Sequence, residues 1–120
     1  MVIRQFDDCR EFIAGDQTIL RELLRPAQGS VDVRYSLAQG RLDPGAASAP
    51  HALTVSEVYY FLAGEGTMHI GSESAPVRKG TVVAVPPGAE QWVKNGGTGA
   101  LEFLCIVDPA WTPACERIMK

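Results

Sequence analysis

Short hydrophobic runs, separated by glycine, proline and polar residues, recur along most of the chain. In residues 30–38, Val31, Val33, Tyr35 and Leu37 alternate with polar or small residues, and a period of two is typical of a strand with one buried face. Four later segments are rich in β-branched or aromatic residues and end at turn residues. They are residues 58–64, 66–71, 80–88 and 100–107. The pattern therefore predicts five strands and an all-β fold.

Residues 18–26 fit two kinds of secondary structure. Four of them would line one face of a short helix, although the same run also suits a strand; they are Ile19, Leu20, Leu23 and Leu24. Pro26 ends the segment in either case, because proline has no backbone donor.

The connections between predicted strands follow from glycine and proline. Residues 64–66, Gly-Glu-Gly, separate two apolar runs, and glycines that accept positive φ favour a hairpin there. Residues 40–57 are rich in small residues, glycine and proline, which is typical of a loop that enters a strand. Many short strands need a closed or sandwiched arrangement to protect their edges, so we expect a barrel.

Composition and charge exclude several classes of protein. A chain of 120 residues with 46% hydrophobic and 21% charged residues fits one globular domain of ordinary size. The net charge is -3 and the basic residues are scattered, so we expect no nucleic-acid partner. No apolar run reaches the roughly 18 residues of a membrane span, and the amino terminus has no signal-peptide core.

The cysteines point to a reducing compartment. Cys9, Cys105 and Cys115 are odd in number and lack CxxC spacing, which argues against a disulfide framework and against a zinc cluster. Cys105 lies in an apolar run and is predicted to be a core residue. We therefore expect a cytoplasmic protein with reduced thiols.

One set of spaced residues in the middle of the chain carries candidate chemistry. Gly45, His51, Glu57 and Gly64 occur in this order at short intervals. The set resembles the first motif of the cupin superfamily, in which a glycine is followed by His-x-His, a glutamate and a second glycine. Leu53 stands where that motif has its second histidine.

A second set follows. Gly80, Pro86, Gly88, Gln91 and Asn95 resemble the second cupin motif, except that Gln91 stands where the motif has a histidine. We interpret the glycines and the proline as turn-forming residues, with Gly88 in a conformation that a side chain would forbid. Asn95 is interpreted as a turn residue as well.

The resemblance implies a fold and a domain organisation. Motif one covers residues 45–64 and motif two covers residues 80–95. A cupin is a jelly-roll β-barrel, so we expect one such domain over residues 1–120.

The resemblance also implies a metal inside the barrel. Three of the motif positions keep a side chain that can donate to a metal: His51, Glu57 and Gln91. One imidazole nitrogen, one carboxylate and one amide oxygen suit Mn, Fe, Ni or Zn, with positions left open for a ligand. Alternatively, Gln91 hydrogen-bonds a loop backbone, and His51 and Glu57 form a pocket pair without metal.

Strand parity extends the predicted pocket. Residues two apart share a face of a strand, so Tyr59 and Phe61 should point the same way as Glu57, and Leu53 the same way as His51. His69 alternates with Met68 and Ile70, and is therefore predicted to point away from the buried side.

Two functions remain open at this stage. The first is a metal-dependent enzyme acting on a small molecule, of the dioxygenase, isomerase or lyase class. The second is a binding or sensory module, without catalysis, that holds a sugar or organic acid. In either case we expect a homodimer, because the apolar segment before Pro26 suits a contact with a second subunit.

Overall fold

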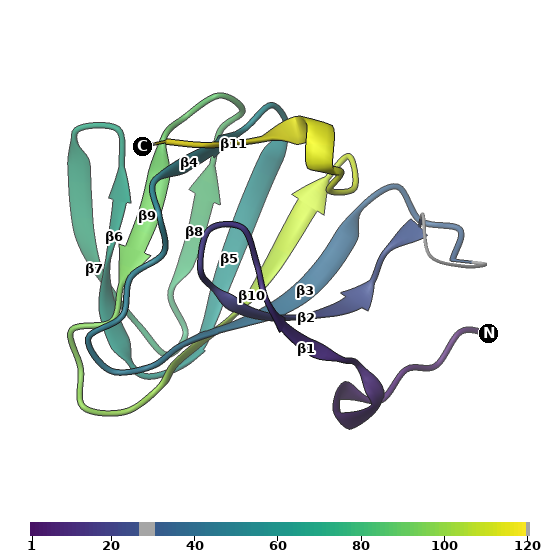
Figure 1. The fold of residues 1–120 in the computed structure, drawn as a ribbon, viewed down its shortest axis with the longest axis horizontal. Coiled ribbons are helices and arrows are strands. Elements are labelled where there is room, and N and C mark those ends of the chain that lie inside the picture. The colour runs from purple at the N-terminus through teal and green to yellow at the C-terminus, as the bar shows by residue number, and fades with distance from the viewer. Residues whose placement is uncertain (27–30, 120) are drawn as a thin grey trace.

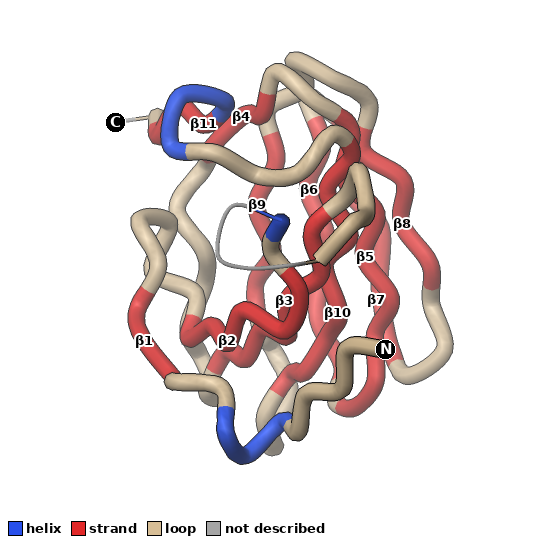
Figure 2. Tube along the Cα trace, turned by 90° about the vertical axis from the view of Figure 1, so that its right-hand side faces the viewer, coloured by secondary structure: helices blue, strands red, loops and turns tan. Residues whose placement is uncertain are grey.

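A computed structural model of the chain describes residues 1–26 and 31–119. Its strands form two antiparallel sheets that pack face to face as a jelly-roll barrel (Figure 1). Strands β1 (Glu11–Ile13) and β2 (Ile19–Leu24) form one edge of the larger sheet, beside β3 (Ser36–Leu42). Figure 2 shows the pair of β11 (Glu116–Ile118) and β4 (His51–Leu53) above one end of the barrel and the β1–β2 pair below it. The predicted all-β class and barrel are confirmed.

The sheets divide the strands as follows. Within the described residues the first sheet has six strands, in the order β1 (Glu11–Ile13), β2 (Ile19–Leu24), β3 (Ser36–Leu42), β10 (Leu101–Asp108), β5 (Ser56–Ala63) and β8 (Val82–Val85). The second, over the same residues, has five, in the order β11 (Glu116–Ile118), β4 (His51–Leu53), β9 (Gln91–Lys94), β6 (Glu65–Ile70) and β7 (Glu73–Arg78). Short 3-10 turns cover Phe6–Asp8 and Pro113–Cys115. None of the helical turns in the described ranges is long and apolar enough to cross a membrane.

The core lies between the sheets, on the inner faces of β5 and β10. The alternation of these strands places Tyr59 and Phe61 inward from β5, opposite Cys105 and Phe103 of β10. The Phe103 ring centroid is 5.4 Å from those of both Tyr59 and Phe61. Cys105 is buried, as predicted, and its thiol is free, as are those of the other two cysteines.

Strand β3 faces this core with small side chains. Ser36, Ala38 and Gly40 pair with Val107, Cys105 and Phe103 of β10. A Cβ atom on Gly40 would lie 2.5 Å from Cε2 of Phe103. The absence of bulk along β3 therefore makes room for an aromatic ring and, next to it, for a cavity.

The strand predicted over residues 30–38 is only partly correct. Residues 31–35 lie outside any strand, and β3 begins at Ser36; residue 30 lies outside the described residues. The partner strand explains the difference, because β10 ends at Asp108 and is followed by Pro109, which has no backbone donor. Beyond that point the Ala110 N–H donates to the Arg34 carbonyl at 2.8 Å, but the segment does not continue as a strand.

The predicted hairpin at residues 64–66 is wrong. Strand β5 already pairs with β10 and β8, so both of its edges are taken, and β6 pairs with β7 and β9 in the other sheet. Gly64, at φ +86°, carries the chain from one sheet to the other. A Cβ there would collide with the Ala100 carbonyl, which is why the crossing needs glycine.

Other predictions are settled by the pairing. The ambiguous residues 18–26 include β2, a strand held between β1 and β3. Gly88 has a φ of +83°, as expected. Asn95 is a buried turn residue, because its Nδ2 donates to the Leu42 and Gly99 carbonyls at 2.9 Å each.

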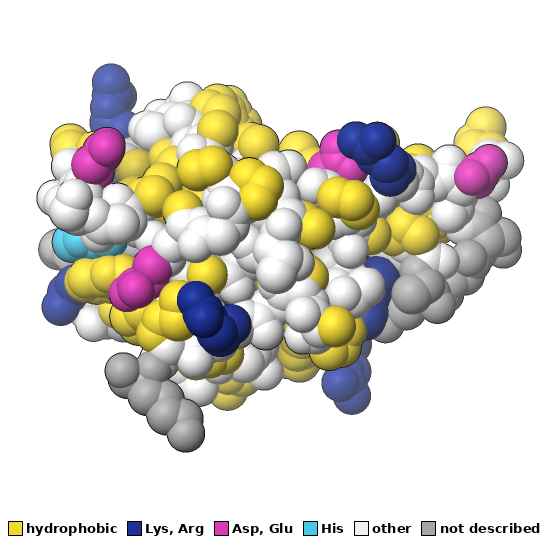
Figure 3. Space-filling view, turned by 90° about the horizontal axis from the view of Figure 1, so that it is seen from above, with side chains coloured by type: hydrophobic (Ala, Val, Ile, Leu, Met, Phe, Trp, Pro, Cys, Tyr) yellow, Lys and Arg dark blue, Asp and Glu magenta, His cyan; other side chains and the backbone are white. Residues whose placement is uncertain are grey.

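The outer surface also follows the expected pattern. His69 points away from buried Met68 and stacks on Trp92 of the neighbouring strand, with the ring centroids 3.7 Å apart. On the face seen from above, the basic side chains lie apart from one another among hydrophobic and neutral groups (Figure 3).

Candidate functional site

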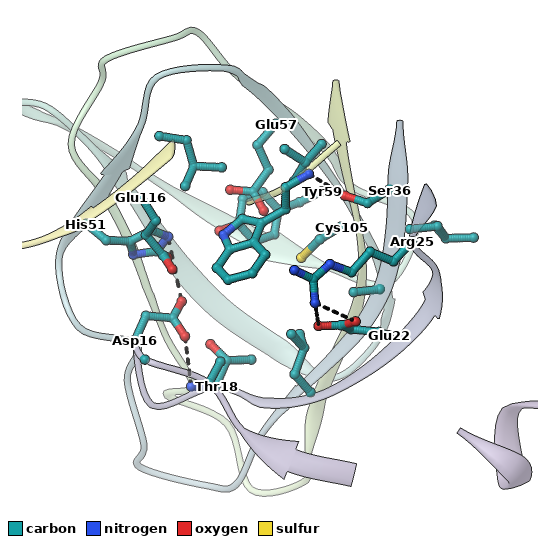
Figure 4. Close-up of a pocket in the computed structure, with 18 of the residues that line it drawn as sticks. Asp16, Thr18, Glu22, Arg25, Ser36, His51, Glu57, Tyr59, Cys105 and Glu116 are labelled. Carbon is teal, nitrogen blue, oxygen red and sulfur yellow. Dashed lines mark hydrogen bonds and ion pairs between the residues drawn. The ribbon is translucent and has the colours of Figure 1, made fainter. Parts of the chain in front are cut away.

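A cavity of about 130 Å³ lies inside the barrel, between the inner faces of β2, β3, β5 and β10 and the β4–β11 pair. Apolar side chains such as Leu20, Phe103 and Val107 form much of its wall. Ionisable side chains reach it from several elements that are distant in sequence, and Figure 4 labels them: Asp16, Glu22, Arg25, His51, Glu57, Tyr59, Cys105 and Glu116.

His51 opens strand β4 with its ring almost fully buried. Its Nδ1 is 2.8 Å from the Ala49 carbonyl oxygen. Because a carbonyl only accepts hydrogen bonds, Nδ1 carries the hydrogen. The other ring nitrogen, Nε2, is directed at Asp16, with 3.6 Å between it and Oδ2.

Asp16 lies in the turn between β1 and β2. Its Oδ1 accepts a hydrogen bond from the Thr18 backbone N–H at 3.0 Å, and its carbonyl accepts one from the Ala49 N–H at 2.7 Å. These bonds fix the turn against the loop before His51. Glu116, the first residue of β11, comes from the opposite side, and one donor atom each of Asp16, His51 and Glu116 lie within 4.8 Å of one another.

Glu57, Gln91 and Tyr59 form a second, deeper group. The Tyr59 hydroxyl donates to Gln91 Oε1 at 2.6 Å, and Gln91 Nε2 donates to Glu57 Oε1 at 2.9 Å. All three side chains are buried. The two bonds fix the orientation of the amide, because a phenol donates to its oxygen and a carboxylate accepts from its nitrogen.

The surroundings shift the protonation of this group. Burial, the largest cause, raises the pKa of Glu57 from 4.5 to about 7, and Asp16 adds to the rise, while His51 and the Gln91 hydrogen bond oppose it. Burial and the nearby Glu57 raise the pKa of Tyr59 well above its ordinary value. Tyr59 therefore stays a hydrogen-bond donor, whereas Glu57 changes charge near neutral pH.

Arg25 and Glu22 lie at the mouth of the cavity. Arg25 Nη1 is 3.4 Å from Glu22 Oε1, and the guanidinium carbon is 5.2 Å from the centre of the Trp111 ring. In Figure 4 the guanidinium points toward the middle of the pocket. Its Nε is buried and has no hydrogen-bond partner in residues 1–26 and 31–119.

The predicted site residues fall into three places. His51, Leu53, Glu57 and Tyr59 line the cavity together. Among the described residues, Gln91 is not one of those that line the cavity. Its side chain bonds the side chains of Tyr59 and Glu57, and not a loop backbone. Phe61 is likewise outside that lining, fully buried in the hydrophobic core.

The four cupin metal positions fit an ion incompletely in this chain. Leu53 supplies no donor and packs with Val107 and Cys115. Gln91 uses one oxygen lone pair for Tyr59 and its nitrogen for Glu57. Of these four positions, only His51 directs a nitrogen lone pair at carboxyl groups outside the motifs, those of Asp16 and Glu116.

No pattern in the sequence pointed to Asp16, Glu116 or Arg25 as site residues. Asp16 two residues before Thr18 is typical of an Asx turn, and nothing else distinguishes it from other surface acids. Glu116 and Arg25 lie at opposite ends of the chain. Only the pairing of β11 with β4, and of β2 with β3, brings them to the cavity.

Comparison with known proteins identifies the family to which the chain belongs. Over 117 residues the chain is 32% identical to an uncharacterised protein of Methanocaldococcus jannaschii, covering 97% of this chain and 93% of the relative. It is 32% identical over 71 residues to the oxalate-binding protein of Thermotoga maritima, covering 58% of this chain and 59% of that protein. The nucleoside dehydratase Pac13 of Streptomyces shares the fold, with a TM-score of 0.80 at 20% identity over 100% of this chain and 92% of that one. Residues 39–107 match the cupin domain family, and the chain therefore belongs to that family.

Proposed function

We propose that this cupin binds a small organic acid inside its barrel. The observation that carries the proposal is the Arg25 guanidinium, which lies on the cavity wall with a buried Nε that lacks a partner among the described residues. A buried donor without a partner costs about 1–3 kcal/mol. A ligand carboxylate would satisfy it with a charge-assisted hydrogen bond.

The size of the cavity limits the acid. An engineered cavity of about 150 Å³ binds benzene, so the 130 Å³ available here suits a molecule of similar or smaller size. A nucleoside, with both a sugar and a base, is too large. The oxalate-binding protein of T. maritima supports the class of ligand, because it is a relative whose ligand is a small dicarboxylate.

A second candidate function is proton transfer on the bound acid. It is favoured by Glu57, whose pKa of about 7 lets the carboxyl give and take a proton at neutral pH, as a general acid or base requires. The Tyr59 and Gln91 bonds hold Glu57 in position. An isomerase or lyase would use this arrangement.

A metal on the cupin positions would add to either function. His51, Glu57 and Gln91 are the cupin positions that keep a donor atom, since the Gln91 oxygen has a second lone pair after accepting from Tyr59; they would hold Mn, Fe, Ni or Zn with fewer protein ligands than the family motifs provide. When bound, the ion would polarise an oxygen atom of the acid.

We further propose a homodimer formed through the amino-terminal segment. Several apolar residues of this segment are exposed: Met1, Val2, Ile3, Phe6 and Ile13. A cluster of exposed apolar side chains favours contact with another protein surface, and a second copy of the chain offers the same surface to it.

The acid-binding proposal is tested by calorimetry with oxalate. Oxamide is the matched control ligand, because it has the shape of oxalate without the charge. Protein is titrated both after chelator treatment and with Mn²⁺ added at equal concentration. We expect binding of oxalate and none of oxamide, and an absence of oxalate binding in both conditions would refute the proposal.

Variants assign the binding to Arg25. Arg25→Gln should weaken oxalate binding at least tenfold, because it removes the charge that faces the cavity. Arg78→Gln is the matched control, since Arg78 is exposed on β7 in the other sheet. Equal oxalate affinity in wild type and Arg25→Gln would contradict the role of Arg25.

A further inference from the structure

We propose that Asp16, His51 and Glu116 form a divalent-cation site at the end of the barrel where β4 meets β11. Only His51 belongs to the cupin motifs. Asp16 and Glu116 lie outside the residues 39–107 that match the family. The site does not require an acid to bind, and it therefore stands apart from the function proposed above.

The first observation is the direction of the imidazole. The side chain of His51 is 3% exposed, and its Nδ1–H is committed to the Ala49 carbonyl. This bond leaves Nε2 as the atom that carries the lone pair. Nε2 points at the two carboxyl groups (Figure 4), and it makes no hydrogen bond that meets normal geometry within the described residues, because a separation of 3.6 Å is too long.

The second observation is the spacing of the donor atoms. Two ligands that are each about 2.1 Å from one zinc ion lie about 3.4 Å apart at the tetrahedral angle. His51 Nε2 and Asp16 Oδ2 are 3.6 Å apart. The donor atoms of the whole set lie within 4.8 Å of one another. His51 Nε2 and Asp16 Oδ2 therefore already stand close to the separation that a shared ion needs, and the Glu116 donor lies within 4.8 Å of both.

The third observation is charge. Asp16 and Glu116 are both acidic, and neither forms an ion pair with a lysine or arginine in the described ranges. Two carboxylates near one imidazole lack a compensating positive charge, and a divalent ion supplies it. One nitrogen and two carboxylate oxygens suit Zn²⁺ or Mn²⁺, with coordination positions left for water or a ligand.

The backbone holds the three donors in place before any ion arrives. The Thr18 N–H fixes Asp16 Oδ1, which leaves Oδ2 free to face the site. Strand β11 fixes Glu116 by pairing it with Leu53, which lies two residues from His51 along β4. A site whose ligands are already oriented loses less conformational entropy on binding.

The test is calorimetric titration of chelator-treated protein with Zn²⁺ and Mn²⁺, with no acid present. Wild type should bind one ion per chain. Asp16→Asn keeps the acceptor for Thr18, and Glu116→Gln keeps the side-chain shape, so both variants should fold and bind the ion at least tenfold more weakly. Glu90→Gln, at an exposed acid, is the matched control and should bind like wild type.

Glu57→Gln separates this site from the cupin set. If the ion is bound by Asp16, His51 and Glu116, the affinity of Glu57→Gln should stay within about threefold of wild type. Loss of the ion in Glu57→Gln, with normal binding in Asp16→Asn, would overturn the proposal and assign the ion to His51, Glu57 and Gln91. Absence of stoichiometric binding in wild type would also overturn it, and the three residues would then form a plain ion pair with a neighbouring acid. Because oxalate is omitted, none of these outcomes depends on the acid-binding proposal.

Discussion

Gln91 lies directly opposite His51 in the antiparallel pairing of β9 with β4, but its amide bonds Tyr59 and Glu57 instead of the imidazole. At this position a cupin histidine would share a metal with His51. The amide instead joins two buried groups of β5 to the second sheet. The consequence is that Gln91 contributes to stability as well as to the site.

Replacing Gln91 should therefore destabilise the fold. Gln91→Leu keeps the volume but leaves the Tyr59 hydroxyl and the Glu57 carboxyl without their partner, so we expect the free energy of unfolding to fall by about 2 kcal/mol or more. Tyr59→Phe, which removes one bond, should cost about 1 kcal/mol. Urea unfolding of both variants and the double variant checks this, and fully additive losses would contradict a connected network.

Stability should fall as the pH rises from 5 to 7. The pKa of Glu57 is raised from 4.5 in the unfolded chain to about 7 in the folded one, so over this interval the folded state binds more protons than the unfolded state. The free energy of unfolding therefore decreases with increasing pH, by about 2 kcal/mol from this group between pH 5 and 7. Its contribution levels off about one pH unit below 4.5 and about one pH unit above 7.

The difference between wild type and Glu57→Gln isolates this effect from the other carboxyl groups. Urea unfolding is measured in chelator at four pH values from 5 to 8, with Glu90→Gln as the control. The slope should be shallower in Glu57→Gln and unchanged in Glu90→Gln. Parallel curves for wild type and Glu57→Gln would show that Glu57 has an ordinary pKa in the folded state.

Gly40→Ala tests how closely β3 approaches the core. The added Cβ would lie 2.5 Å from Cε2 of Phe103 and 3.0 Å from Cγ2 of Thr18, so the ring must shift. We expect a loss of about 1–3 kcal/mol in unfolding free energy, as is usual for overpacking. Gly96→Ala has open space around the new Cβ and should change stability by less than about 0.5 kcal/mol; similar losses in both variants would refute the packing argument.

The dimer is tested by light scattering at micromolar concentration. We expect twice the mass of the chain for wild type, and a monomer for the double variant Phe6→Asp and Ile13→Asp, because charges on the contact surface cost desolvation. Val82→Asp is the control, because Val82 is exposed and lies on β8 at the other edge of the six-stranded sheet. A monomeric wild type, or a dimer that only Val82→Asp disrupts, would exclude the amino-terminal contact.

Local pattern predicted the central strands and part of the site. The β-branched and aromatic residues of 58–64 predicted strand β5, and parity with Glu57 predicted that Tyr59 and Phe61 lie on its inner face, where the structure buries both. His51 and Glu57 were found by spacing, and they do meet in one cavity. Parity alone placed Phe61 beside Glu57, but the cavity ends before the Phe61 ring because Tyr59 and Phe103 close it.

Pairing between distant segments was not predictable in the same way. Strand β7 has one buried residue, Val77, and contains Pro76, so its hydrophobic pattern is too weak to stand out, as is common at a sheet edge. The predicted hairpin between β5 and β6 was wrong because the turn residues do not reveal that both edges of β5 pair with other strands. Asp16 and Glu116 reach His51 only through such pairings.

The β1–β2 segment has a consequence for how this protein can diversify. It brings Asp16, Leu20 and Arg25 to the cavity, yet it precedes the residues that match the cupin family. Ligand choice can therefore change by exchange of one peripheral segment while the hydrophobic centre stays intact. For protein engineering, a library restricted to the cavity-lining positions Leu20, Glu22 and Arg25 would sample new specificities and leave Asp16 and Thr18, which hold the turn, unchanged.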